Sequence, residues 1–113
     1  LASGARTLNN VVCAVGGAAI DKMPNGKDWR ARYDAKFPKQ FQVYSPYTYD
    51  ATMVLVDAMK RANSVDPKVY GPKLAATNYQ GVTAKVAFEP QGDLKNPAMT
   101  LYVYKDGKKV AIN

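Results

Sequence analysis

One junction in the sequence combines side chains and backbone groups that could bind a small molecule. Residues 41–44 alternate apolar and polar types, which predicts a strand, and Ser45 followed by Pro46 predicts the start of a helix. Ligands of α/β sheets lie outside the carboxyl ends of strands, and the free N–H groups at a helix start suit a carboxylate. Tyr44 and Ser45 are therefore candidate ligand-binding residues. The alternative interpretation is that the tyrosines here pack in a core or an interface.

The residue types argue against catalysis. The 113 residues contain no His, which excludes Ser-His-Asp triads and imidazole metal ligands. Cys13 is the single Cys, so a Cys-cluster zinc site is excluded, and its apolar neighbours predict a buried, inert thiol. Glu89 is the single Glu, and no phosphate-binding loop, dinucleotide fingerprint or nucleophile elbow occurs. We predict no catalytic residue, no metal site and no cofactor.

The net charge of +7 leaves two interpretations of the surface. A basic chain can bind nucleic acid, but only four of its 16 cations are Arg, the usual reader of base edges. The lysines are scattered, and the densest group surrounds one turn at 105–109. This pattern favours a solvated Lys-rich surface and no nucleic-acid partner. A small basic interaction module remains the alternative, and a small α/β enzyme is less favoured still.

Apolar spacing predicts alternating elements in the first part of the chain. Residues 8–15 follow helical spacing after the capping residue Thr7, and residues 18–23 form a short apolar run typical of a buried strand. Asp28 is the expected cap of a better helix, in which an aromatic stripe is expected to pack in the core; the stripe comprises Trp29, Tyr33 and Phe37. Pro38 is expected to stop that helix.

The remaining elements are predicted mainly from prolines and turn residues. The helix that begins at Ser45 is expected to run for about four turns, to Asn63. Asp66 and Pro67 predict another helix, which Gly71–Pro72 should bend or split. The sequence 79–81 predicts a break, 82–88 a half-buried strand and 90–93 a turn. A final hairpin is expected over 99–112 around Asp106–Gly107, a type I′ turn signal. The fold class is α/β, ending in a β-hairpin, and no apolar run approaches the ~20 residues of a membrane span.

Several of these segments resemble the periplasmic branched-chain amino-acid-binding proteins of ABC transporters. The first segment reads FQVYSPYTYDA at 41–51 and continues over 55–62. The second comprises YQGVT at 79–83, FEPQGD at 88–93 and the hairpin at 101–108. Their order and spacing match the last third of those proteins, from about residue 8 to the end of this chain.

The resemblance implies part of a two-lobe periplasmic-binding-protein fold with Rossmann-like lobes. Residues 1–37 would belong to the second lobe, 38–42 to a hinge crossover and 43–92 to the first lobe. Residues 93–98 would form another crossover, and the hairpin at 99–113 would return to the second lobe. The chain would then be a fragment, expected to dock with a missing N-terminal portion or to self-associate.

The resemblance also implies a function and a set of contacts. It implies the solute-binding component of a periplasmic ABC importer, which holds an amino acid or related small carboxylate between its lobes and docks on a membrane permease. Tyr44 stands where the family has an aromatic residue beside the ligand. Gly16, before Gly17, stands where the family commonly has the acidic residue that binds the ligand ammonium, so that charge is missing here. The family's Ser and Thr positions for the ligand carboxylate lie outside this chain.

Overall fold

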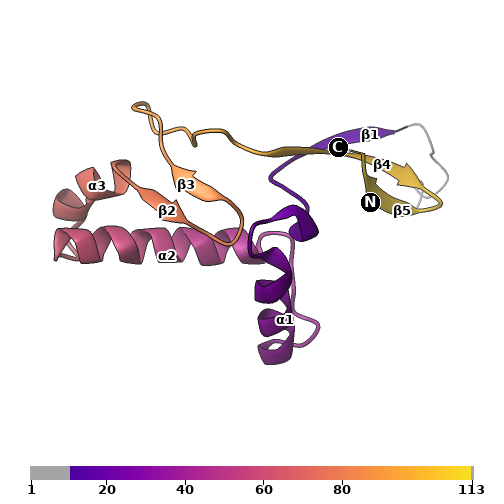
Figure 1. The fold of residues 1–113 in the computed structure, drawn as a ribbon, viewed down its shortest axis with the longest axis horizontal. Helices are drawn as coiled ribbons and strands as arrows, with labels where there is room; N and C mark the ends of the chain where they lie inside the picture. Colours follow the sequence, from indigo (N-terminus) through magenta and orange to yellow (C-terminus); the bar gives the residue numbers. More distant parts are fainter. Residues whose placement is uncertain (1–10, 113) are drawn as a thin grey trace. The chain divides into compact units, whose positions relative to one another are not determined.

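The computed structural model describes residues 11–112, and the chain divides into two units (Figure 1). One unit comprises Leu1–Ala19 and Pro97–Asn113, of which 11–19 and 97–112 are described. The other unit comprises Ile20–Asn96. We call them the sheet unit and the helical unit.

The sheet unit contains three antiparallel strands in the order β1-β4-β5. These are β1 (Val12–Gly16), β4 (Met99–Lys105) and β5 (Lys108–Ala111). Asp106 and Gly107 connect β4 to β5 with φ angles of 51° and 74°, as a type I′ turn requires. The predicted hairpin is confirmed, since its register places Val103 opposite Val110.

Side-chain and backbone hydrogen bonds hold the end of β1 against β4. The Thr100 hydroxyl is buried and donates to the Gly17 carbonyl oxygen at 2.7 Å. The Gly17 N–H donates to the Ala98 carbonyl oxygen at 2.7 Å, and the φ of Gly17 is +99°. Gly17 therefore turns the chain out of the sheet in a conformation that suits glycine.

Two predictions for the first part of the chain are wrong. The helix expected over 8–15 is strand β1 where the structure describes it, because 12–16 pair with β4 residues more than 80 positions away; residues 8–10 lie outside the described part. The strand expected over 18–23 is a loop followed by one 3₁₀ turn, η2 (Ile20–Lys22). No described strand pairs with 18–23, so its apolar residues pack without a sheet.

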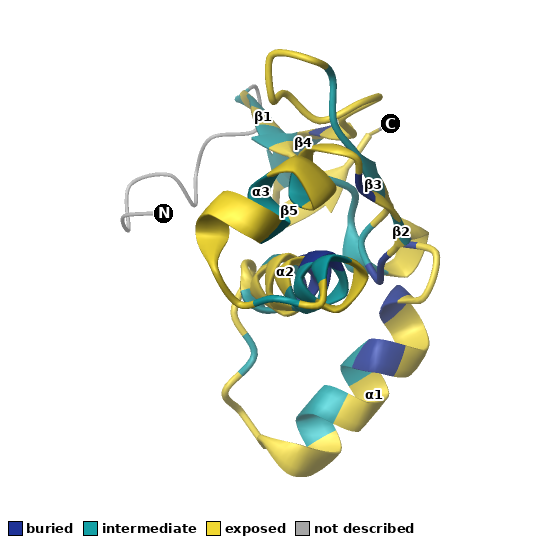
Figure 2. Ribbon diagram, turned by 90° about the vertical axis from the view of Figure 1, so that its left-hand side faces the viewer, coloured by how far each residue is buried: buried dark blue, intermediate teal, exposed yellow. Residues whose placement is uncertain are grey.

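The predicted aromatic helix is present as α1 (Gly26–Lys36), and it begins before Asp28. Its N-cap is Asn25, whose carbonyl accepts a hydrogen bond from the Trp29 N–H at 3.0 Å. A Cβ on Gly26 would overlap the Ile20 carbonyl oxygen, so η2 can approach α1 only over a glycine. Figure 2 shows the buried residues of α1 on its upper turns, and Trp29 is 4% exposed, as expected for core packing. The core prediction is wrong for Phe37, which is 40% exposed.

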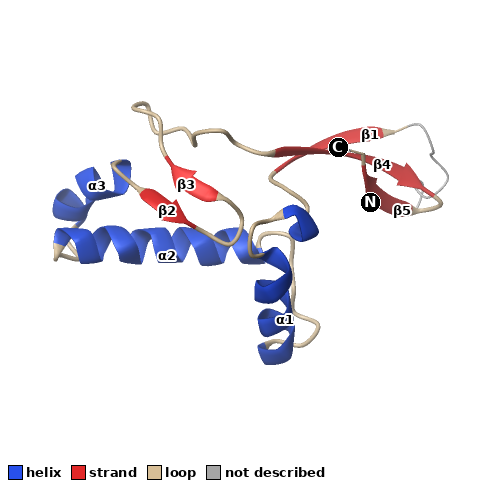
Figure 3. Cartoon of the chain, viewed as in Figure 1, coloured by secondary structure: helices blue, strands red, loops and turns tan. Residues whose placement is uncertain are grey.

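The strand expected over 41–44 is absent, and the chain between α1 and α2 is a loop (Figure 3). A turn replaces it, in which the Gln42 N–H donates to the Ser45 hydroxyl at 3.0 Å and the Ser45 N–H donates to the Gln42 carbonyl at 3.0 Å. This turn uses the backbone groups that a sheet would need. The helix after it is confirmed as α2 (Ser45–Ala62), with Pro46 in its first turn.

Helix α3 (Pro67–Ala75) confirms the second cap-and-proline start, since the Asp66 carboxylate accepts from the Lys68 N–H at 2.9 Å. The expected split at Gly71–Pro72 does not occur. The helix continues past Pro72, whose carbonyl accepts from the Ala76 N–H at 3.2 Å. Near the end of a short helix, the missing proline N–H costs only one hydrogen bond.

A two-stranded antiparallel sheet follows, formed by β2 (Asn78–Gln80) and β3 (Lys85–Ala87). The break expected at 79–81 is therefore mostly strand. Of the strand expected over 82–88, only the residues of β3 form one. The turn expected at 90–93 is present, closed by a hydrogen bond from the Glu89 N–H to the Asp93 carbonyl at 2.7 Å. Burial raises the pKa of the Tyr79 phenol above its ordinary value, and nearby negative charge acts in the same direction.

The loop 81–84 is held by one carboxylate. Asp50 of α2 is 4% exposed and accepts hydrogen bonds from the Val82 N–H at 2.8 Å and from the N–H and hydroxyl of Thr83 at 2.8 and 2.6 Å. A Cβ on Gly81 would overlap this carboxylate. The Val82 carbonyl in turn accepts from the Asn25 N–H at 3.4 Å. The loop thus connects α2 to the start of α1.

We expect Asp50→Asn to destabilise the helical unit by about 3 kcal/mol, because the amide nitrogen cannot accept hydrogen bonds and leaves buried donors unpaired. Urea denaturation followed by circular dichroism measures this. The matched control is Asp57→Asn, on the same helix, whose carboxylate pairs with Arg61 at 2.8 Å nearer the surface and should cost about 0.5 kcal/mol. Equal effects of the two variants would refute the role given to Asp50.

Candidate functional site

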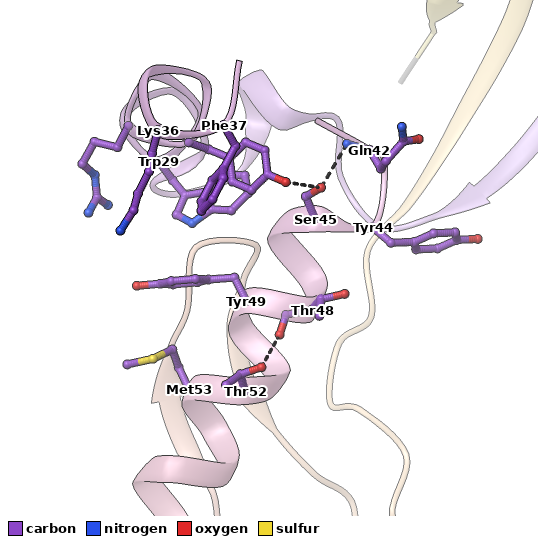
Figure 4. A pocket seen from close by; sticks show the side chains of 12 residues that line it. Trp29, Lys36, Phe37, Gln42, Tyr44, Ser45, Thr48, Tyr49, Thr52 and Met53 are labelled. Carbon is purple, nitrogen blue, oxygen red and sulfur yellow. Dashed lines mark hydrogen bonds between the residues drawn. The ribbon is translucent and has the colours of Figure 1, made fainter. Parts of the chain in front are cut away.

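The helical unit contains an open cleft of about 700 Å³ between α1, the loop after it and the first turns of α2. Figure 4 shows Trp29, Lys36 and Phe37 on the α1 side, with Tyr49 and Met53 on the α2 side. All lining residues belong to the helical unit, so the cleft is complete within one unit.

Aromatic rings form the wall of the cleft. The ring centroids of Trp29 and Tyr33 are 4.9 Å apart with an interplanar angle of 29°, a stacked pair. Tyr49 approaches Trp29 from α2, with a centroid distance of 5.8 Å. The Arg30 guanidinium lies 3.6 Å from the ring centroid of Phe41, which fixes the connecting loop on α1. The wall is therefore assembled from both helices.

Hydroxyl groups line the end of the cleft at the start of α2. The Ser45 hydroxyl accepts from the Gln42 N–H and donates to the Tyr33 hydroxyl at 3.5 Å. The Tyr33 hydroxyl donates in turn to the Gln40 carbonyl at 3.5 Å. This chain of hydrogen bonds joins α1, the loop and α2 at one point.

The charged residues that line the cleft are both cations, Arg32 and Lys36, and no carboxylate lines it. They lie one turn apart on α1, on the side that carries Trp29 and Tyr33. Arg32 follows Trp29 by three positions and Lys36 follows Tyr33 by three positions, and this spacing is the sequence signal that could have identified them. Interpreting the aromatic stripe as core alone missed it.

The structure places the sequence-predicted site residues in both units. Tyr44 and Ser45 both line the cleft, and Tyr44 is 76% exposed, with its ring directed away from the aromatic wall (Figure 4). Tyr44 is the N-cap of α2 and follows a turn, so it does not lie at the carboxyl end of a strand. Gly16 and Gly17 belong to the sheet unit, at the end of β1.

Comparison with known proteins identifies the family. A family model described as "Periplasmic binding protein" matches residues 1–109. The chain belongs to this family. It is 25% identical over 95 residues to the leucine-, isoleucine-, valine-, threonine- and alanine-binding protein of Pseudomonas aeruginosa, covering 83% of this chain and 26% of that protein.

A solved structure confirms the fold class. The leucine-binding protein LivK of Thermotoga maritima superposes with a TM-score of 0.75 at 23% identity, covering 91% of this chain and 30% of that one. The α/β fold and the sequence resemblance are thus confirmed, and the chain spans between a quarter and a third of the length of these relatives.

Within residues 11–112, no helix is long and apolar enough to cross a membrane. Among the same residues, no cluster of three or more His, Cys, Asp or Glu side chains could hold a metal ion.

We expect Ser45→Ala to lower stability by about 1 kcal/mol, because the Gln42 N–H loses its acceptor and the turn before α2 loosens. The exposed Thr52→Ala variant on the same helix removes only a hydrogen bond to the Thr48 carbonyl and should be neutral or slightly stabilising. Thermal unfolding of both variants, followed by circular dichroism, tests this. An Ser45→Ala variant as stable as the parent would show that the hydroxyl does not hold the turn.

Proposed function

We propose that this chain is part of the solute-binding component of a periplasmic ABC importer. The ligand is an amino acid of the branched-chain type or a related small carboxylate, and it binds between two lobes without chemistry, so the protein is not an enzyme. The observation that carries this proposal is the family match over 1–109 together with a relative named for binding leucine, isoleucine and valine. The partner is the importer's membrane permease.

The two units support the two-lobe arrangement. The unit boundary between Asn96 and Pro97 falls inside the crossover expected at 93–98. The other boundary, between Ala19 and Ile20, precedes the crossover expected at 38–42 and groups α1 with α2. Our proposal therefore assigns α1 to the first lobe and places the first crossover near residue 19. Hinge closure of the lobes around the solute is the mechanism.

The proposed ligand contacts come from both units. Tyr44 and Ser45 contribute from the start of α2, and Gly16 and Gly17 contribute from the end of β1. A Cβ on Gly16 would meet no atom within 4 Å, so this position has open space beside it. An acidic side chain could occupy that space and supply the missing partner for a ligand ammonium.

We also propose that the chain docks with an N-terminal portion of a longer receptor or, when alone, self-associates. One face of the β1-β4-β5 sheet supports this, because register and alternation place exposed apolar residues together on it; they are Val12, Met99, Leu101, Val110 and Ile112. Monomeric proteins rarely leave such a face uncovered.

We expect light scattering of the isolated 113-residue chain to give the molar mass of a dimer or a larger species. Association should weaken when Leu101 and Val110 are both replaced by Lys, because charge on the apolar face opposes pairing. The control is the same pair of changes at Thr48 and Thr52, on exposed positions of α2. A monodisperse monomer with cooperative melting would contradict the proposal.

The ligand assignment is tested on the longer receptor that carries this segment. We expect a thermal-shift screen to find an amino acid or small carboxylate that raises its melting temperature. Tyr44→Ala should weaken that binding about tenfold, whereas Tyr70→Ala on α3 should not.

Gly16→Glu should strengthen the binding of an amino acid about tenfold, since it adds a charged hydrogen-bond acceptor. A screen in which no amino acid or small carboxylate shifts the melting would refute the assignment.

A further inference from the structure

We propose that the cleft of the helical unit is itself a binding site for a small planar aromatic carboxylate. It adjoins the amino-acid site proposed above at Tyr44 and Ser45, which line the cleft, but its cationic residues lie on α1. Its charge is the first argument. Arg32 and Lys36 are the charged lining residues, and no lining side chain is acidic. An anion in the cleft therefore meets only attractive side-chain charges along its walls.

The two cations remain accessible to a ligand. Lys36 forms no ion pair with any described acidic residue, and its Nζ lies 5.8 Å from the ring centroid of Phe37, at the edge of the aromatic wall. Arg32 contacts Asp28 at 3.1 Å, but the two side chains are 65% and 78% exposed. Such an exposed pair contributes little and exchanges readily for a ligand carboxylate, which accepts two parallel hydrogen bonds from a guanidinium.

The shape and lining of the cleft favour a carboxylate ligand that carries a planar aromatic ring. Tyr49 is 41% exposed and extends the aromatic wall from α2, with its ring packed against Trp29. Aromatic rings attract one another at centroid distances of about 4.5–7 Å, so a planar ligand ring can pack against this wall. A volume of about 700 Å³ lies within the usual range of small-molecule sites.

The wall is held in place before any ligand arrives. The Trp29 ring packed against Tyr49, the Ser45 hydroxyl bonded to Tyr33 and the Arg30 contact to Phe41 each join two of the three segments around the cleft. A preformed wall costs little ordering entropy on binding. Because every one of these residues lies in the helical unit, the site does not depend on the closure of two lobes.

The single tryptophan of the chain, Trp29, is a spectroscopic probe inside the proposed site. Titration of the 113-residue chain with phenylacetate should change the fluorescence of Trp29 until the signal saturates. For a ligand of this size we expect a dissociation constant of about 1 mM. The neutral phenylacetamide and the aliphatic cyclohexylacetate should each bind at least about fivefold more weakly, and the cationic benzylamine should not bind. Equal binding of phenylacetate and phenylacetamide would overturn the role of the cations.

Matched variants on α1 separate a site from a general effect of charge. Lys36→Glu should weaken phenylacetate binding about tenfold or more, because it reverses the charge at the wall. Lys27→Glu makes the same change of net charge on the same helix, at an exposed position that does not line the cleft, and should leave binding within about twofold. Equal losses in both variants would show attraction to the whole basic chain and refute a site.

The role of the aromatic wall is tested by substitution of Tyr49, and competition with leucine is a second, independent measurement. Tyr49→Ala should weaken phenylacetate binding, whereas Tyr70→Ala on α3 should not, and circular dichroism establishes that both variants are folded. Excess leucine should not displace phenylacetate from the parent chain. Displacement would show that the cleft is part of the amino-acid site, contrary to this proposal, whereas failure of the amino-acid screen would leave phenylacetate binding unaffected.

Discussion

The buried carboxylate of Asp50 is the contact on which the helical unit depends. It accepts three hydrogen bonds from Val82 and Thr83, more than 30 positions away, and it replaces the strand pairing that this loop would otherwise need. Buried backbone N–H groups must find an acceptor, so a loop that leaves a sheet here requires a side chain in this position. Gly81 is also required for this contact, because only a residue without a Cβ leaves room for the carboxylate.

The same loop determines where α1 lies relative to α2, and hence the cleft. Its Val82 side chain is buried, and its carbonyl accepts a hydrogen bond from the Asn25 N–H at the start of α1. From the middle of α1, Arg30 contacts the ring of Phe41 and holds the connecting loop. The aromatic and cationic residues of α1 therefore face α2 because both ends of the segment are fastened. The cleft is a consequence of these contacts more than of any single lining residue.

The sheet unit depends more on backbone hydrogen bonds, and less on buried side chains, than the helical unit does. Its strands are joined mainly by backbone pairing across the β1–β4 ladder and by the hydrogen bond from Thr100 to Gly17. One of its faces carries apolar side chains that remain exposed, such as Val12 and Met99. Backbone pairing thus defines its topology, and among the described residues this face lacks the burial that normally stabilises a sheet.

The sequence by itself determined the features whose causes are local. The starts of α2 and α3 follow from proline and a neighbouring polar residue, and the hairpin turn follows from Asp106–Gly107, because each depends only on backbone geometry within a few residues. Only the tertiary structure decided that 12–16 is a strand and that 41–44 is not, since β pairing requires a distant partner that periodicity does not reveal. Tyr44 and Ser45 could be singled out from the sequence, but the cleft beside Ser45 required α1 and α2 to meet. That meeting depends on Asp50 and the loop 81–84, a long-range contact that no local pattern specifies.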